Sequence, residues 1–68
     1  MKDYKQYVGR EVSVFTAEGS LVGELMAVGQ HTLTVKAEAM YDDRGEPGPT
    51  PKGVMLVEGS AITWVQVR

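Results

Sequence analysis

The sequence predicts an all-β domain, a small five-stranded β-barrel with a short helix in front of it. Two observations predict this fold. From Glu11 onward, apolar residues recur with the two-residue period of a strand that has one buried face. Short turns, such as Glu18-Gly19-Ser20, then separate the alternating segments. Five short strands joined in this way favour a closed or half-closed barrel.

Residues 1–9 predict a helix of one or two turns, which Asp3 can cap and Gly9 ends. One side of this helix carries Tyr4, Tyr7 and Val8. A helix this short is unstable by itself, so we expect the tyrosines to pack it against the rest of the domain.

The predicted strands are residues 11–17, 21–28, 32–40, 53–59 and 61–68. The second strand is partly apolar on both faces, and Gly23 in its middle indicates a bend or a close backbone approach. The third strand alternates most regularly, and its predicted inward residues are Leu33, Val35, Ala37 and Ala39. Between the third and fourth strands, residues 41–53 hold all three prolines and predict a long, polar, variable loop.

The size of the chain predicts self-association. A single domain of 68 residues buries only about 60% of the surface that its unfolded form exposes. Small domains therefore need disulfides, a metal or oligomerisation. The chain has no cysteine and one histidine, so no disulfide, metal site or cofactor is predicted. Oligomerisation is the supplement that remains.

The last two predicted strands supply the surface for that assembly. Both are apolar on two faces, and no lysine, proline or inward charge protects the edge of the fourth strand. We expect this edge to pair with another subunit, head to tail, into a closed ring. The candidate interface residues are Val54, Met55, Leu56, Val57, Ile62, Trp64 and Val65. In the alternative, the N-terminal helix covers the spare face and the chain is a monomer.

Two segments resemble the motifs of the Sm/Lsm family, which includes the bacterial host-factor Hfq branch. The first is VSVFTAEGSLVGELMAVGQHTLTV and the second is VMLVEGSAITWV, with the variable loop between them. The resemblance covers nearly the whole chain. It implies a strongly bent, SH3-like five-stranded barrel and a homo-oligomeric ring, commonly of about six or seven subunits. In that family the fourth strand of one subunit pairs with the fifth strand of the next.

The resemblance also implies binding of short single-stranded RNA, rich in uridine or adenine, near the pore of the ring. The matching positions in this chain are Gln30, His31, Thr32, Glu58, Gly59 and Ser60. His31 matches the base-stacking position of the family, and Thr32 is the best match for its asparagine. Glu58 stands where the family has an arginine, and Gly29 stands where it has an aspartate.

Those departures leave a second function open. A carboxylate at position 58 repels phosphate, and the formal net charge of the chain is −2. The chain can therefore be a structural or protein-interaction ring that has lost RNA binding. The segments GREV and EGSLVGEL also resemble the start of a PRC-barrel interaction domain. Duplex DNA is disfavoured as a partner, because proteins that bind it through phosphates usually carry a basic surplus.

Enzymatic activity is not predicted. The sequence holds no nucleophile–base pair with an orienting group, no glycine-rich phosphate loop and no spacing typical of metal ligands, so no catalytic residue is assigned. The N-terminal residues do not resemble a signal peptide, and no apolar run reaches the roughly 20 residues that span a bilayer. We therefore expect a cytoplasmic protein with no membrane partner.

Overall fold

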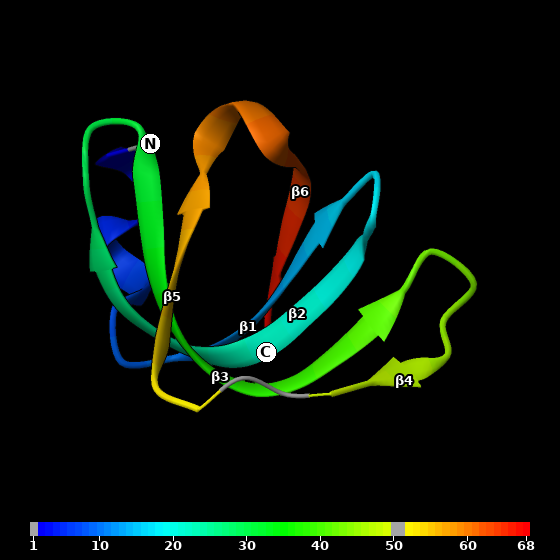
Figure 1. The fold of residues 1–68 in the computed structure, drawn as a ribbon. Coiled ribbons are helices and arrows are strands. Elements are labelled where there is room, and N and C mark those ends of the chain that lie inside the picture. The colour runs from blue at the N-terminus through cyan, green and yellow to red at the C-terminus, as the bar shows by residue number, and fades with distance from the viewer. Residues whose placement is uncertain (1, 50–51) are drawn as a thin grey trace.

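A computed structural model describes residues 2–49 and 52–68 (Figure 1). Its elements, in chain order, are η1 (Lys2–Tyr7), β1 (Glu11–Thr16), β2 (Gly19–Val28), β3 (Thr32–Asp42), β4 (Pro47–Gly48), β5 (Val54–Glu58), η2 (Gly59–Ala61) and β6 (Ile62–Val67). The six strands form one antiparallel sheet in the order β4-β3-β2-β1-β6, and β5 also pairs with β3. The all-β prediction is confirmed.

The core lies on one face of the three central strands. Six of their side chains are almost fully buried and form one cluster, namely Val12, Val14, Leu21, Leu25, Leu33 and Val35. Leu33 and Val35 are among the residues predicted to face inward on the third strand. Half-buried residues of β5 and β6 pack against the edge of this cluster. β1, β2 and β3 therefore supply the buried core, and β5 and β6 pack against it with half-buried side chains.

Gly23 lets β2 and β3 approach closely where the sheet bends. A Cβ atom at this position would collide with the carbonyl oxygen of Lys36. The strand register shifts at the same place, between Val22 and Gly23, and leaves Glu38 without a partner on β2. The close approach inferred from the sequence is confirmed.

The same irregularity corrects one inward assignment on β3. Ala37 packs against the core as expected, but Ala39 does not, and Met40 packs there instead. The extra residue in β3 at Glu38 reverses the alternation of side chains, because a shift of one residue moves each later side chain to the other face.

The N-terminal segment is helical but forms a 3-10 helix, and the described residues contain no α-helix. Tyr4 and Tyr7 pack against the core, as predicted, whereas Val8 is exposed. Gly9 ends the segment with φ +92°, and its N–H donates to the carbonyl oxygen of Leu25 at 2.8 Å. Neither 3-10 helix is long and apolar enough to cross a membrane.

The predicted count of five strands is wrong, because part of the expected loop pairs with β3. Pro47 lies opposite Tyr41, and Gly48 lies opposite Met40. The turn between them is held by the Asp42 side chain, whose Oδ1 accepts the backbone N–H groups of Arg44 and Glu46 at 2.9 Å each. Residue 1 of the predicted helix and residues 50–51 of the predicted loop lie outside the described residues.

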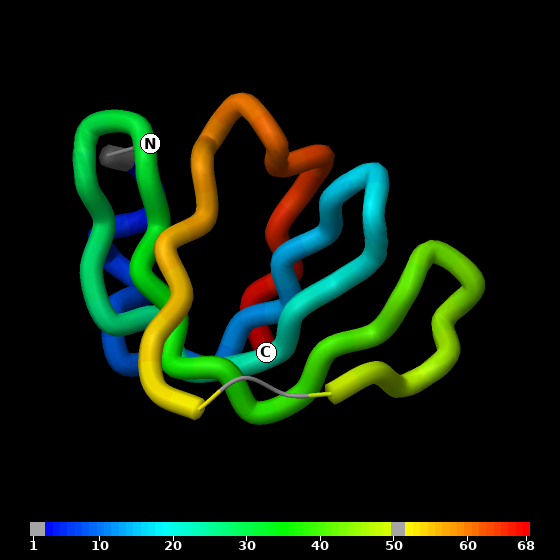
Figure 2. The backbone as a smooth tube through the Cα atoms, in the orientation of Figure 1, coloured from blue at the N-terminus to red at the C-terminus, as the bar shows by residue number. Residues whose placement is uncertain are grey.

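The sheet is not closed into a barrel. In the described residues β5 pairs only with β3 and β6 pairs only with β1. The three residues of η2 connect β5 to β6, and Figure 2 shows the chain passing between them over an open gap in the backbone trace. Because this connection does not bring the two strands into register, each keeps one edge without a strand partner.

Candidate functional site

A hollow on the surface brings together five of the six residues that the sequence singled out for RNA. It is lined by Gln30, His31, Glu58, Gly59 and Ser60. The first two belong to the turn between β2 and β3, and the others lie at the end of β5 and in η2. The sixth residue, Thr32, begins β3 beside the hollow but is not part of its lining.

Backbone pairing explains why these distant segments meet. Thr32 lies opposite Glu58 in the β3–β5 pair. One residue further, the N–H of Gly59 donates to the carbonyl oxygen of His31 at 2.7 Å. The turn itself is closed by the N–H of Gly29, which donates to the carbonyl oxygen of Thr32 at 2.8 Å. Backbone pairing therefore fixes the position of the hollow.

The chemistry of the hollow is polar and slightly acidic. The side chains of Gln30, His31 and Glu58 are all exposed to solvent. An imidazole ring can stack on a base, and amide and hydroxyl groups can donate to and accept from base edges. Glu58 is the one lining residue with a formal charge at pH 7, and no lysine or arginine belongs to the lining. Phosphate groups are not favoured at this position.

The candidate interface residues divide into two sets. Met55, Val57, Ile62 and Val65 turn inward and pack against the core. The other three point to solvent: Val54 is 56% exposed, Leu56 71% and Trp64 55%. These are the three highest exposures among the large apolar side chains of the described residues. β5 and β6, which each keep an unpaired edge, therefore also carry the most exposed large apolar side chains of the described residues.

Trp64 does not stand alone on the outer face. Its ring stacks on that of Phe15, with the centroids 4.7 Å apart and the planes inclined by 24°. The two residues lie opposite each other in the β1–β6 pair. Sequence reasoning gave Phe15 no role. The available signal was its place directly after the core-facing Val14, because successive side chains of a strand point to opposite faces.

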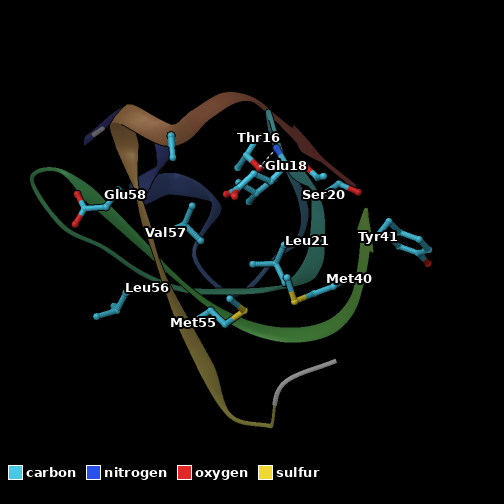
Figure 3. A pocket seen from close by; sticks show the side chains of 13 residues that line it. Thr16, Glu18, Ser20, Leu21, Met40, Tyr41, Met55, Leu56, Val57 and Glu58 are labelled. Carbon is cyan, nitrogen blue, oxygen red and sulfur yellow. Dashed lines mark hydrogen bonds between the residues drawn. The ribbon is translucent and has the colours of Figure 1, made fainter. Parts of the chain in front are cut away.

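A second cavity, of about 270 Å³, lies on the core side of the sheet beneath β5. Leu21, Met40, Met55 and Val57 point into it, whereas Leu56 and Tyr41 point away (Figure 3). Thr16, Glu18, Ser20 and Glu58 are also part of its lining. Sequence reasoning did not predict it, because its apolar lining has the pattern of an ordinary core.

An acidic group occupies the outer face at the other end of the central strands. Glu11 lies opposite Glu24, and Glu24 lies opposite Lys36. A hydrogen bond to the Glu11 carboxyl, together with some burial and the nearby negative charges, raises the pKa of Glu38. The guanidinium of Arg68 lies 3.8 Å from Glu11. In the described residues no group of three or more His, Asp or Glu side chains could hold a metal ion.

No protein-family model matches the chain, and no curated protein matches its sequence. The features that bear on function are therefore the unpaired edges of β5 and β6 and the hollow around His31.

Proposed function

We propose that this chain is the subunit of an Sm-like homo-oligomeric ring that binds short single-stranded RNA at the hollow around His31. In this proposal the sheet is a strongly bent, SH3-like small barrel, and the ring contains about six or seven copies. The free edge of β5 in one copy pairs with the free edge of β6 in the next. The protein acts as a binding scaffold and not as an enzyme.

The observation that carries the assembly is the pair of unpaired strand edges. The three most exposed large apolar side chains of the described residues lie on β5 and β6. Unpaired, apolar strand edges template the addition of another strand. Two different edges on one chain give a head-to-tail contact, and a head-to-tail contact closes into a ring when its rotation allows. The register shift at Gly23 supports the barrel, because such an irregularity bends a strand.

The hollow supports RNA as the first ligand to test. His31 offers a ring for stacking on a base, and Gln30 and Ser60 offer donors and acceptors for base edges. Single-stranded RNA is recognised through such contacts even where the surface is not basic. In a ring the hollow repeats once per subunit, so several nucleotides can bind to identical sites.

Glu58 favours a second candidate, a ring that binds a protein partner in place of RNA. A carboxylate in the hollow repels phosphate and attracts lysine or arginine side chains. If this candidate holds, Glu58→Arg creates RNA affinity that the unchanged protein lacks. If the RNA proposal holds, the unchanged protein already binds, and Glu58→Arg strengthens the binding roughly tenfold.

Two measurements test the proposal. Light scattering at high micromolar concentration should give the mass of a closed oligomer, and a single-chain mass would refute the ring. Fluorescence anisotropy at low salt should detect binding of short U-rich or A-rich RNA. His31→Ala should weaken it by about 1–3 kcal/mol, the usual value of one stacked base. The control is Tyr41→Ala, which removes an exposed aromatic ring outside the hollow.

A further inference from the structure

The cavity beneath β5 is larger than the voids of an ordinary protein core. Its volume is about 270 Å³. Protein interiors hold few voids larger than a water molecule, whose share of the liquid volume is about 30 Å³. A dry apolar cavity of about 150 Å³ already takes up a molecule the size of benzene. This cavity is partly open to solvent, so a small ligand can enter it.

One part of the cavity is apolar and adaptable. Leu21, Met40, Met55 and Val57 point into it (Figure 3). Met40 belongs to β3 and Met55 to β5, so two separate strands each contribute a thioether. Methionine side chains adjust to the shape of a neighbouring group, and their sulfur atoms make favourable contacts with aromatic rings. The apolar part of the cavity therefore suits an aromatic ring.

The end of the cavity at the turn between β1 and β2 is polar. Thr16, Glu18 and Ser20 lie together there (Figure 3). The Thr16 hydroxyl accepts the N–H of Glu18 at 3.2 Å and donates to the carbonyl oxygen of Gly19 at 3.3 Å, which fixes this turn. One carboxylate and two hydroxyl groups offer oxygen acceptors for the three N–H donors of an ammonium group.

The charged residues of the lining favour a cation. Glu18 and Glu58 both line the cavity, and no lysine, arginine or histidine occurs among the described residues of the lining. A positively charged ligand is therefore attracted, and an anionic one is repelled. Glu18 is the better partner for the cation, because the Thr16 and Ser20 hydroxyls lie beside it, whereas Glu58 lies on the other side of the cavity (Figure 3).

From these observations we propose that the cavity binds a small aromatic amine, with its ring between Met40 and Met55 and its ammonium group at Glu18. Pockets for drug-sized ligands begin at roughly 300 Å³, so the ligand is a single ring with a short chain. The site lies within one chain, and it therefore depends neither on the proposed ring nor on RNA binding.

Phenethylamine tests the site, with phenethyl alcohol as its neutral analogue of nearly the same shape. Both are titrated at pH 7 into protein whose methionine methyl groups carry an isotope label for NMR. We expect the signals of Met40 and Met55 to shift and that of Met26 to stay, because Met26 is exposed on β2 outside the lining. The amine should bind roughly threefold tighter than the alcohol or more, the usual effect of one accessible charged contact.

A charge-removing variant locates the ammonium group. Glu18→Gln changes an exposed turn residue and leaves the apolar lining intact. It should weaken amine binding roughly threefold or more and leave alcohol binding unchanged. The control is Glu46→Gln, which changes the net charge equally but lies between β3 and β4, outside the lining. It should leave the binding of both compounds unchanged.

Each alternative result is decisive. If neither compound shifts the signals of Met40 and Met55, the cavity is not a binding site. If the amine and the alcohol bind equally, or if Glu46→Gln weakens amine binding as much as Glu18→Gln does, Glu18 does not hold the ammonium group. These results leave the ring and the RNA site standing, because oligomer mass and His31→Ala test those separately.

Discussion

The central strands and the last two strands carry similar apolar patterns but have different surroundings. β1 has a strand partner on each side, and three of its consecutive residues are buried. β5 has β3 as its single strand partner in the described residues, and each of its residues is exposed or half-buried. The difference shows that the burial of an apolar residue depends on which strands pack beside it, and that its hydrophobicity alone does not determine it. The central strands therefore form the buried core, while β5 and β6 keep exposed apolar surface.

The largest expected effect comes from truncating one leucine in each region. Leu33→Ala removes a side chain with no exposed surface and should lower the free energy of unfolding by about 3–5 kcal/mol, since it leaves a cavity in the core. Leu56→Ala should change it by less than about 0.5 kcal/mol at concentrations where the protein is monomeric. Chemical denaturation followed by circular dichroism measures both. Equal losses would show that the two regions are not distinct.

A smaller effect is expected from Gly23→Ala. The added Cβ meets a backbone carbonyl that cannot move without separating β2 from β3, so a loss of about 1–3 kcal/mol is expected. The matched control is Gly45→Ala, where a Cβ would meet no atom within 4 Å. Its cost arises from the positive φ of that turn alone. If the two variants lose the same stability, the close approach does not constrain the sheet.

The sequence was sufficient for features that depend on local pattern. The alternation in the third predicted strand located Leu33 and Val35 in the core, and a glycine inside an apolar strand located the close approach to β3. Five of the six residues proposed for RNA binding line one hollow, and Thr32 does not. Their role in binding stays a prediction, and it came from a family resemblance and not from the local pattern.

Features that depend on register were not predictable in this way. β4 consists of a proline and a glycine, which carry no strand signal and pair with β3 because the Asp42 side chain holds the turn. The Phe15–Trp64 stack joins residues far apart in the sequence, and it needs the β1–β6 register to be known. The reversal of faces after Ala37 results from one extra residue in β3, which the alternation itself does not reveal.

The smallest effect concerns the acidic group on the outer face of the central strands, where the most stable region contains an unfavourable interaction. The raised pKa of Glu38 means that the folded chain binds a proton there more tightly than the unfolded chain does. Its contribution to stability is complete below the ordinary pKa of 4.5 and is lost as the pH rises through the raised value. Glu38→Gln should therefore raise the thermal midpoint at pH 7 and have little effect near pH 4.

The control for this last effect is Glu18→Gln, which changes the net charge equally but lies in the turn between β1 and β2, outside the acidic group. Thermal unfolding at both pH values compares the three proteins. If Glu38→Gln gains no more than this control at pH 7, net charge and not the contact with Glu11 sets the pH dependence. The acidic group would then not destabilise the folded chain at pH 7.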